Sequence, residues 1–449
     1  MARTKTVHRC ADCGATEPRW AGRCSGCGSW GTLVEERDAP TRTPTAGLPG
    51  PSTPRPIAEV AAGSWSPMAT HLGELDRVLQ GGLVPGSVTL VGGEPGIGKS
   101  TLLLQALAGL AKDGRRCLYV TAEESAEQVR LRAERLGALP PNLWLVADTA
   151  LPHVVAHLGS VGPDVVVLDS IQAVHDPELS SAPGSVAQVR ECAHALVQEA
   201  KARTMAVVLV GHVTKEGGLA GPRTLEHVVD TVLTFDGERH HALRLLRAAK
   251  HRFGATTELG LFAMTDAGLD GVPDPSALFL VDRRPGVAGS AVAPVLDGRR
   301  PLLVEVQALV TKTKIPTPRR SAQGLDSGRL ALVLAVLDDQ LELELHRADV
   351  HSVVAGGVDV DEPGADLALA LALVSARTGR PLAGDVVACG ELGLGGELRQ
   401  VHQTARRLTE AARLGFRRAV VPATAPSAPP GIELLRATTV AEAVSLVAE

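Results

Sequence analysis

The residue run with the clearest chemical meaning is a glycine-rich stretch that ends in lysine and serine. It comprises Gly93, Glu94, Pro95, Gly96, Ile97, Gly98, Lys99 and Ser100, followed by Thr101. This is a complete phosphate-loop pattern, in which backbone N–H groups wrap the phosphates of a nucleotide. We expect Lys99 to reach the outer phosphates and Ser100 to ligate Mg²⁺. The pattern therefore predicts binding of a nucleoside triphosphate, and a chance glycine turn is the less favoured alternative.

This chemistry needs a strand before the loop and a helix after it, because the helix N-terminus attracts the anion. The sequence offers both, as an apolar run at 88–91 and a helical pattern at 103–110. From residue 61 to 284 apolar runs and helical patterns alternate, which is typical of a doubly wound, mainly parallel α/β sheet. We expect strands at residues 88–91, 117–121, 164–168, 207–210 and 231–235.

Acidic and histidine residues stand at the ends of these expected strands. Asp169 follows a strongly apolar run, where a carboxylate can hold Mg²⁺ beside Ser100; a helix-capping Asp is the alternative. Glu123 and Glu124 follow the strand at 117–121, where a carboxylate can orient the water that attacks the γ-phosphate. The alternative is that the two glutamates are ordinary residues of the first turn of the next helix, where Glu is common. His212 ends the strand that starts at 207 and can bond the γ-phosphate, a role that the residues alone leave open.

Four of the seven cysteines lie within the first twenty-seven residues. They form two C-x2-C pairs separated by ten residues: Cys10, Cys13, Cys24 and Cys27. Four thiolates at this spacing predict one tetrahedral Zn²⁺, and two disulfides are the alternative. The segment 1–37 is too small to fold without its ion, so we expect a zinc knuckle there. The segment 38–60 is rich in Pro, Thr and Gly and is predicted to be a linker.

The composition is that of a globular protein with more than one domain. The chain has 449 residues, of which 45% are hydrophobic and only 2% aromatic. The net charge of −5 excludes a global basic surface, so any nucleic-acid contact must come from local patches. The first residues lack an apolar signal segment and no long apolar run exists, so we expect a cytoplasmic protein without a membrane partner. A second α/β domain is expected over 285–449, with helices at 366–378 and 404–414.

Several stretches together carry a resemblance to a known family. They are the four-cysteine knuckle, GEPGIGKS, VTAEES, VVVLDSIQAV, VGHVTKEG and the run 250–254. In their order and spacing the chain resembles the RadA (Sms) family of bacterial DNA repair proteins. The resemblance implies a RecA-like ATPase domain over 61–284, with Glu123 as the hydrolytic glutamate, Asp169 as the Walker B acid and His212 as a switch residue.

The run 250–254 resembles the signature pentapeptide of that family, which is usually Lys-Asn-Arg-Phe-Gly. This chain has His251 in place of the Asn. The resemblance implies that Lys250 and Arg252 complete a neighbouring subunit's ATP site, as an arginine finger does, or engage DNA. A surface pair of cations is the alternative.

The C-terminal stretches 361–368 and 390–397 resemble the proteolytic domain of Lon. Where Lon carries its catalytic serine this chain has Gly364, and where Lon carries its lysine it has Ala405. A Ser/Lys protease needs both groups, so we expect no peptidase chemistry. The domain is better interpreted as a module for assembly and DNA contact, with a run of cations near its start: Lys312, Lys314, Arg319 and Arg320.

The favoured function is a DNA-dependent ATPase in homologous recombination. The resemblance implies a hexameric ring that uses ATP, Mg²⁺ and Zn²⁺, binds single-stranded and branched DNA, and migrates strand-exchange intermediates made by the RecA recombinase. Two alternatives come from other classes: an ATP-switched scaffold of the KaiC kind and a Lon-type ATP-dependent protease.

Overall fold

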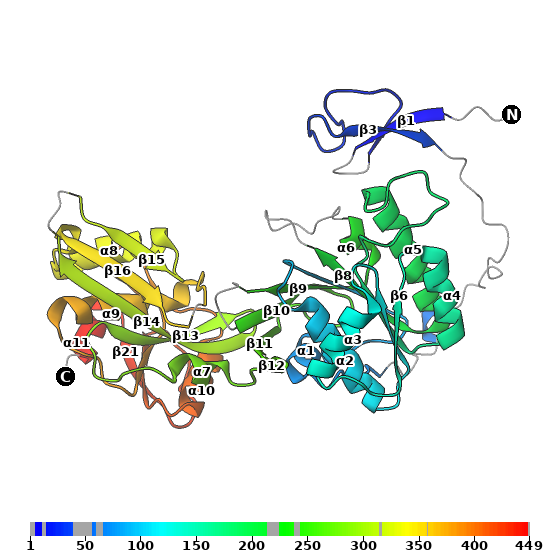
Figure 1. Ribbon diagram of the computed structural model, residues 1–449. Helices are drawn as coiled ribbons and strands as arrows, with labels where there is room; N and C mark the ends of the chain where they lie inside the picture. The colour runs from blue at the N-terminus through cyan, green and yellow to red at the C-terminus, as the bar shows by residue number, and fades with distance from the viewer. Residues whose placement is uncertain are drawn as a thin grey trace. The chain divides into compact units, whose positions relative to one another are not determined.

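The computed structural model describes residues 5–10, 15–38, 56–59, 66–212, 224–237, 243–313, 317–356 and 358–447. Contacts divide the chain into two compact units, Met1–Pro273 and Asp274–Glu449 (Figure 1). The sequence-based domain limits stay predictions. Helix α7 (Pro275–Leu280) packs on the sheet of the second unit, which is why the division falls ahead of residue 284. Most of the predicted linker lies outside the described residues.

The first unit contains a nine-stranded sheet with the order β12-β11-β10-β9-β4-β8-β7-β5-β6. Its strands are β4 (Val88–Gly93), β5 (Cys117–Thr121), β6 (Leu143–Ala147), β7 (Val165–Asp169), β8 (Ala206–His212), β9 (Thr231–Asp236), β10 (Leu243–His251), β11 (Leu259–Thr265) and β12 (Gly268–Gly271). From β9 to β6 neighbouring strands are parallel, and β10 to β12 extend the sheet antiparallel. The predicted α/β fold class is confirmed, and the sequence did not anticipate β6 or the antiparallel extension.

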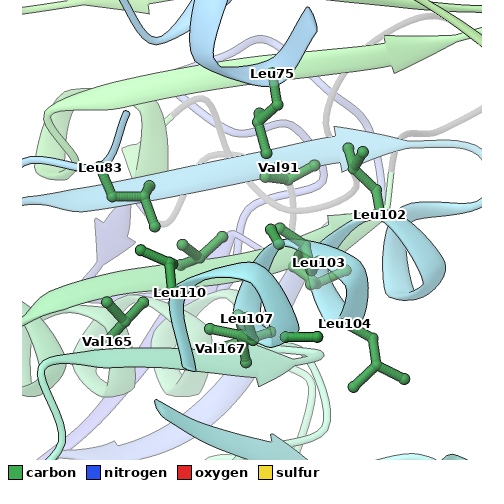
Figure 2. Packing of buried hydrophobic residues seen from close by; sticks show 14 of the residues in the cluster. Leu75, Leu83, Val91, Leu102, Leu103, Leu104, Leu107, Leu110, Val165 and Val167 are labelled. Carbon is green, nitrogen blue, oxygen red and sulfur yellow. The ribbon is translucent and has the colours of Figure 1, made fainter. Parts of the chain in front are cut away.

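Both faces of the parallel part are covered by helices, which is why β4, β5 and most of β7 are buried without alternation. The helices are α1 (Gly73–Val78), α2 (Lys99–Lys112), α3 (Ala126–Arg135), α4 (Leu151–Val161), α5 (Val186–Arg203) and α6 (Thr224–Val228). Figure 2 shows Leu103 and Leu107 of α2 packed over Val91, Val165 and Val167. The core thus fixes α2, and with it the phosphate loop, against the middle of the sheet.

The N-terminal segment is a small three-stranded sheet with the order β2-β1-β3. Its strands are β1 (Lys5–Cys10), β2 (Thr16–Glu17) and β3 (Leu33–Asp38). Its apolar core is small, consisting of Cys10, Cys24 and Leu33, so packing alone contributes little to its stability.

The second unit contains a seven-stranded sheet with the order β15-β16-β14-β13-β17-β20-β21. Its strands are β13 (Ser290–Asp297), β14 (Arg300–Lys312), β15 (Arg320–Gln323), β16 (Ala348–Val354), β17 (Val386–Ala388), β20 (Arg418–Pro422) and β21 (Glu433–Ala437). A separate pair is formed by β18 (Glu391–Leu392) and β19 (Leu398–Arg399). The α-helices, besides α7, are α8 (Ser327–Leu341), α9 (Asp366–Thr378), α10 (Thr404–Arg413) and α11 (Val440–Val447). The expected helices at 366–378 and 404–414 correspond to α9 and α10. No helix among the described residues is long and apolar enough to cross a membrane.

Candidate nucleotide site

The phosphate loop connects the end of β4 at Gly93 to the start of α2 at Lys99. A Cβ atom on Gly93 would lie 2.4 Å from the carbonyl oxygen of Phe235 in β9, so no side chain fits there. Gly98 has φ +115°, a conformation that residues with a side chain rarely adopt. These two glycines let the backbone approach β9 closely and turn into α2, which presents its N-terminal N–H groups to an anion.

A cavity of about 360 Å³ opens beside this loop. Its lining residues are Pro95, Gly96, Gly98, Lys99, Ser100, Thr101, Thr121, Glu123, Glu124, Arg132, Arg135 and Asp169. The structure therefore brings Lys99, Ser100, Glu123 and Asp169 to one cavity, from α2 and from the carboxyl ends of β5 and β7.

Lys99 is 5% exposed and its ammonium group is held against the loop itself. Its Nζ donates hydrogen bonds to the carbonyl oxygens of Gly93 at 2.8 Å and Glu94 at 2.9 Å. Burial lowers the pKa of Lys99, and the negative charges of Asp169 and Glu123 oppose that shift. A phosphate entering the cavity supplies a full negative charge, which the two carbonyl dipoles only partly replace.

Ser100 and Asp169 form a direct contact at the start of α2. The Ser100 hydroxyl donates to Asp169 Oδ2 at 2.5 Å, and the hydroxyl of Tyr119 in β5 donates to the same oxygen at 2.6 Å. A hydroxyl and a carboxylate oxygen beside a phosphate site are the hard ligands that Mg²⁺ takes, usually with waters and phosphate oxygens. The donor set therefore fits a magnesium ion bound together with a nucleotide.

The two adjacent glutamates after β5 have different neighbours. Glu124 accepts a hydrogen bond from Arg132 Nη2 of α3 at 2.7 Å, which ties it to the helix. Glu123 is exposed toward the cavity and accepts a hydrogen bond from the hydroxyl of Ser170, the residue after Asp169. Of the two, Glu123 is the one that contacts the residue next to Asp169.

His212 is the last residue of β8, the strand next to β4. In the parallel register it pairs with Gly93, the first residue of the phosphate loop. The backbone therefore brings His212 to the same sheet edge as the loop, while its side chain lies outside what is described.

Lys250 and Arg252 are not part of this cavity. Strand β10 runs antiparallel to β9, and His251 pairs with Thr231, which itself pairs with Thr89 near the start of β4. The two cations therefore lie at the amino ends of the parallel strands, opposite the phosphate loop. Lys250 Nζ donates to the carbonyl oxygens of Glu226 at 2.7 Å and Val229 at 2.8 Å. Arg252 forms an ion pair of 2.9 Å with Asp230.

His251, which replaces the family's usual Asn, points into its own sheet. It is 8% exposed, and its Nδ1 lies 3.0 Å from the Thr231 hydroxyl oxygen. Its ring meets that of Phe253 edge to face. Burial lowers the pKa of His251, because it disfavours the charged form of the ring. This position anchors the segment that carries Lys250 and Arg252.

Sequence reasoning missed three residues that line or underlie the cavity. Tyr119 lies two positions before Thr121 in β5, so both side chains lie on the same face of the strand. This two-residue period is the sequence signal that could have placed Tyr119 near the cavity. Arg132 and Arg135 come from α3, whose amphipathic pattern gives no sign that the helix borders a nucleotide site. Arg132 Nη1 is buried and has no hydrogen-bond partner within the described part of the chain.

The N-terminal ribbon gathers its cysteines as a metal site requires. The Sγ atoms of Cys10, Cys24 and Cys27 all lie within 4.8 Å of one another, and those of Cys10 and Cys27 are 3.6 Å apart. That distance is longer than the S–S bond of a disulfide, which is about 2.05 Å. It is close to the ~3.8 Å that separates two thiolate sulfurs bound to one tetrahedral zinc ion. The backbone N–H of Gly26 points to Cys24 Sγ at 3.3 Å. The three described sulfurs fit Zn²⁺, and the predicted fourth ligand, Cys13, lies outside the described residues.

The position that matches the Lon nucleophile is filled by an ion pair. Gly364 lies in the 3₁₀ turn Pro363–Ala365, and a Cβ there would lie 2.7 Å from Arg407 Nη1 and 2.8 Å from Glu362 Oε1. Arg407, on α10, is 1% exposed and pairs with Glu362 through both of its terminal nitrogens. Ala405, two residues before it, is exposed. This arrangement offers neither a nucleophile nor room for one.

These features define a P-loop nucleotide-binding protein that carries an N-terminal cysteine ribbon and a second α/β unit. Three family models match the chain: the AAA domain over residues 63–218, the rubredoxin metal binding domain over 8–35, and subunit ChlI of Mg-chelatase over 354–425.

Relatives that match along the whole chain identify its family more specifically than the three family models do. The chain is 48% identical over 454 residues to DNA repair protein RadA of Pseudomonas aeruginosa, covering 100% of both chains. It is 45% identical over 452 residues to DNA repair protein RadA of Bacillus subtilis, covering 99% of both. For DNA repair protein RadA of Mycobacterium tuberculosis the identity is 45% over 453 residues, covering 100% of this chain and 94% of the relative. The chain belongs to the RadA family of DNA repair proteins.

Proposed function

We propose that this protein is a magnesium-dependent ATPase that acts in DNA repair as a ring-forming DNA motor. The observation that carries the proposal is the convergence of Lys99, Ser100, Glu123 and Asp169 on one cavity at the N-terminus of α2. Membership of the RadA family supports the DNA repair role. Migration of RecA strand-exchange intermediates is the particular activity that we propose.

In this proposal each residue has one task. Lys99 and the loop N–H groups bind the outer phosphates, and Ser100 with Asp169 holds the magnesium. Magnesium, when bound, neutralises charge that develops on the phosphate oxygens. Glu123 accepts a proton from, and orients, the attacking water. His212, delivered to the same edge by β8, contacts the γ-phosphate and reports its loss.

Lys250 and Arg252 have a task only if a second subunit is present. They lie at the sheet edge opposite their own phosphate loop, so they cannot reach their own nucleotide. In a ring, that edge of one subunit faces the loop edge of the next, and the two cations complete the neighbour's site. We propose a hexameric ring on this basis.

Exposed cations of the second unit offer a contact for DNA phosphates. Lys312 ends β14 opposite Ala348 of β16, and Arg320 begins β15 opposite Val350, so both lie at one end of the sheet, close to Arg319. All three side chains are exposed. Lys314, the fourth residue of the predicted run, lies outside the described residues. Contacts of this kind weaken as salt rises, because bound phosphates release counterions.

The decisive experiment measures the ATPase rate with single-stranded and duplex DNA, together with particle mass with and without nucleotide. We expect stimulation by single-stranded DNA, salt-sensitive binding and the mass of a closed ring. A variant with Ala at three positions, Lys312, Arg319 and Arg320, should bind DNA with a weaker salt dependence. We expect the slope of the logarithm of the association constant against the logarithm of the salt concentration to fall in magnitude by about 2. The control replaces two exposed arginines of the same unit, Arg380 and Arg406. An ATPase that no DNA stimulates favours the KaiC-like scaffold and contradicts the motor.

The cysteine ribbon is proposed to dock RecA or displaced DNA rather than to take part in hydrolysis. Four thiolates saturate a zinc ion and leave no position for a reaction. We therefore expect Cys24→Ser with Cys27→Ser to release zinc and leave the basal ATPase rate within about twofold, since neither residue lines the nucleotide cavity. Zinc content and ATP turnover are measured on the same sample. Loss of turnover with the melting temperature of the other units unchanged would show that this assignment is wrong.

A further inference from the structure

Tyr119 is the chain's single tyrosine, and it lies in the middle of β5. Its side chain is 1% exposed and belongs to the apolar cluster that includes Val165 and Val167. A phenol hydroxyl in such surroundings needs a hydrogen-bond partner, because losing water without one costs free energy. The partner is Asp169, whose Oδ2 accepts the hydroxyl at 2.6 Å.

The strand register sets this contact. In the parallel pair of β5 and β7, Tyr119 lies opposite Val167 and Thr121 lies opposite Asp169. Because side chains alternate between faces, Asp169 lies on the same face as Val167, one step nearer the carboxyl edge. The tyrosine ring spans that step, so its hydroxyl meets the carboxylate from inside the core. Two core strands, rather than a loop, therefore hold the contact.

Both side-chain hydrogen bonds of Asp169 within the described part of the chain converge on one oxygen. Oδ2 accepts from Tyr119 of β5 and from Ser100 of α2, at 2.6 Å and 2.5 Å. Two donors from different elements restrain the rotation of the carboxylate. Within the described residues no side-chain donor contacts the second oxygen, Oδ1, which would be the one to hold a magnesium-bound water.

We propose that Tyr119 is a positioning residue for the nucleotide-bound magnesium: its hydroxyl fixes the carboxylate of Asp169 in the orientation that the ion needs. The inference rests on the proposed function of the site and adds a residue that the phosphate-loop pattern does not contain. Hydrogen bonds to the groups that bind a metal typically change metal affinity by about 10–100-fold.

The direction of this hydrogen bond follows from the groups themselves. A carboxylate can only accept, and a tyrosine hydroxyl, with an ordinary pKa of about 10, carries its proton at neutral pH. Tyr119 is therefore the donor and Asp169 the acceptor.

The first test is Tyr119→Phe, which removes only the hydroxyl and keeps the ring in the core. Binding of a fluorescent, slowly hydrolysed ATP analogue to the full-length protein is titrated with MgCl₂ and repeated in EDTA. We expect the Mg²⁺ concentration for half-maximal effect to rise by about 10-fold, with binding in EDTA unchanged. The matched control is Thr89→Val, which removes a buried hydroxyl from β4 outside the cavity and should leave the Mg²⁺ requirement unchanged.

A second test needs no substitution. Because the chain has one tyrosine, growth on 3-fluorotyrosine places a single fluorine label in the protein. Its ¹⁹F resonance should shift when MgCl₂ and the ATP analogue are added together, and much less with the analogue in EDTA. This readout keeps the inference testable if the phenylalanine variant does not fold.

The outcomes separate the inference from the function on which it rests. If the wild-type protein binds the analogue without any dependence on Mg²⁺, the proposed site is wrong. If the wild type depends on Mg²⁺ but Tyr119→Phe shows the same requirement, or loses only thermal stability, the positioning role is wrong and the site stands. A ¹⁹F signal indifferent to Mg²⁺ likewise overturns the role.

Discussion

Lys99→Ala is expected to lower the ATPase rate by roughly 10²–10³-fold, equivalent to about 3–4 kcal/mol of transition-state stabilisation. Lys99 is the one lysine that lines the nucleotide cavity among the described residues, and it is buried with its ammonium group on the loop. In the Lys99→Ala variant, no lysine ammonium group stabilises the negative charge that develops on the transferred phosphoryl group. Steady-state turnover and analogue binding should be measured together, because the lysine contributes to both.

The chain offers a matched control for this change at the other end of the same helix. Lys112 is the last residue of α2 and is exposed. Lys112→Ala should leave turnover within about twofold of the wild type, as expected for a surface change. If Lys99→Ala hydrolyses ATP at the wild-type rate, residues 93–100 are not a working phosphate loop.

Glu123→Gln should separate binding from hydrolysis. The amide keeps the size of the side chain and its bond to Ser170, but it cannot accept a proton from water. We expect turnover to fall by roughly 10²–10⁴-fold while ATP analogue binding in MgCl₂ stays near that of the wild type. Such a variant should also hold ATP long enough for any nucleotide-dependent assembly to be isolated.

The neighbouring acids test whether this assignment is specific. Glu124→Gln weakens the bond to Arg132 and should reduce turnover less, by about 10-fold or below, since that carboxylate is tied to α3. Glu127, exposed on α3 and outside the cavity, is the neutral control. If Glu124→Gln is the more damaging change, the two glutamates have exchanged roles and Glu123 is not the base.

Much of the fold could be predicted because its signals are local. Each of the five expected strands corresponds to one observed strand, and their ends differ by at most two residues where the apolar run continues past a glycine or stops at a charge. Strand β6 was missed although its five residues form a continuous apolar run. It lies at the edge of the sheet, where its side chains are at most partly buried. Strands β10 to β12 are joined as hairpins, and β10 alternates between more and less buried residues, which is a local signal. They were missed because the prediction followed only the alternation of strands and helices.

The candidate site shows the same limit at the level of single residues. The phosphate loop and Asp169 could be predicted because a glycine pattern and an acid after a buried run are short-range features. The strand period places Tyr119 on the same face as Thr121, but its contact with Asp169 depends on the register of β5 with β7. The contact of Arg132 with Glu124 depends on the packing of α3. The same holds for Gly364, whose lack of a side chain is explained by the ion pair of Glu362 with Arg407, which comes forty-three positions after Gly364 in the chain.

The amino-acid sequence alone determined that the chain has a phosphate loop, a cysteine set spaced for zinc and an alternation of strands and helices. Glycine conformations, thiolate spacing and burial periodicity act over a few residues, so the sequence expresses them directly. Only the tertiary structure decided that Lys250 and Arg252 lie at the sheet edge opposite the loop, and that Ser100 and Tyr119 meet on one oxygen of Asp169. Strand order and register decide such encounters, because they bring together atoms that are far apart along the chain.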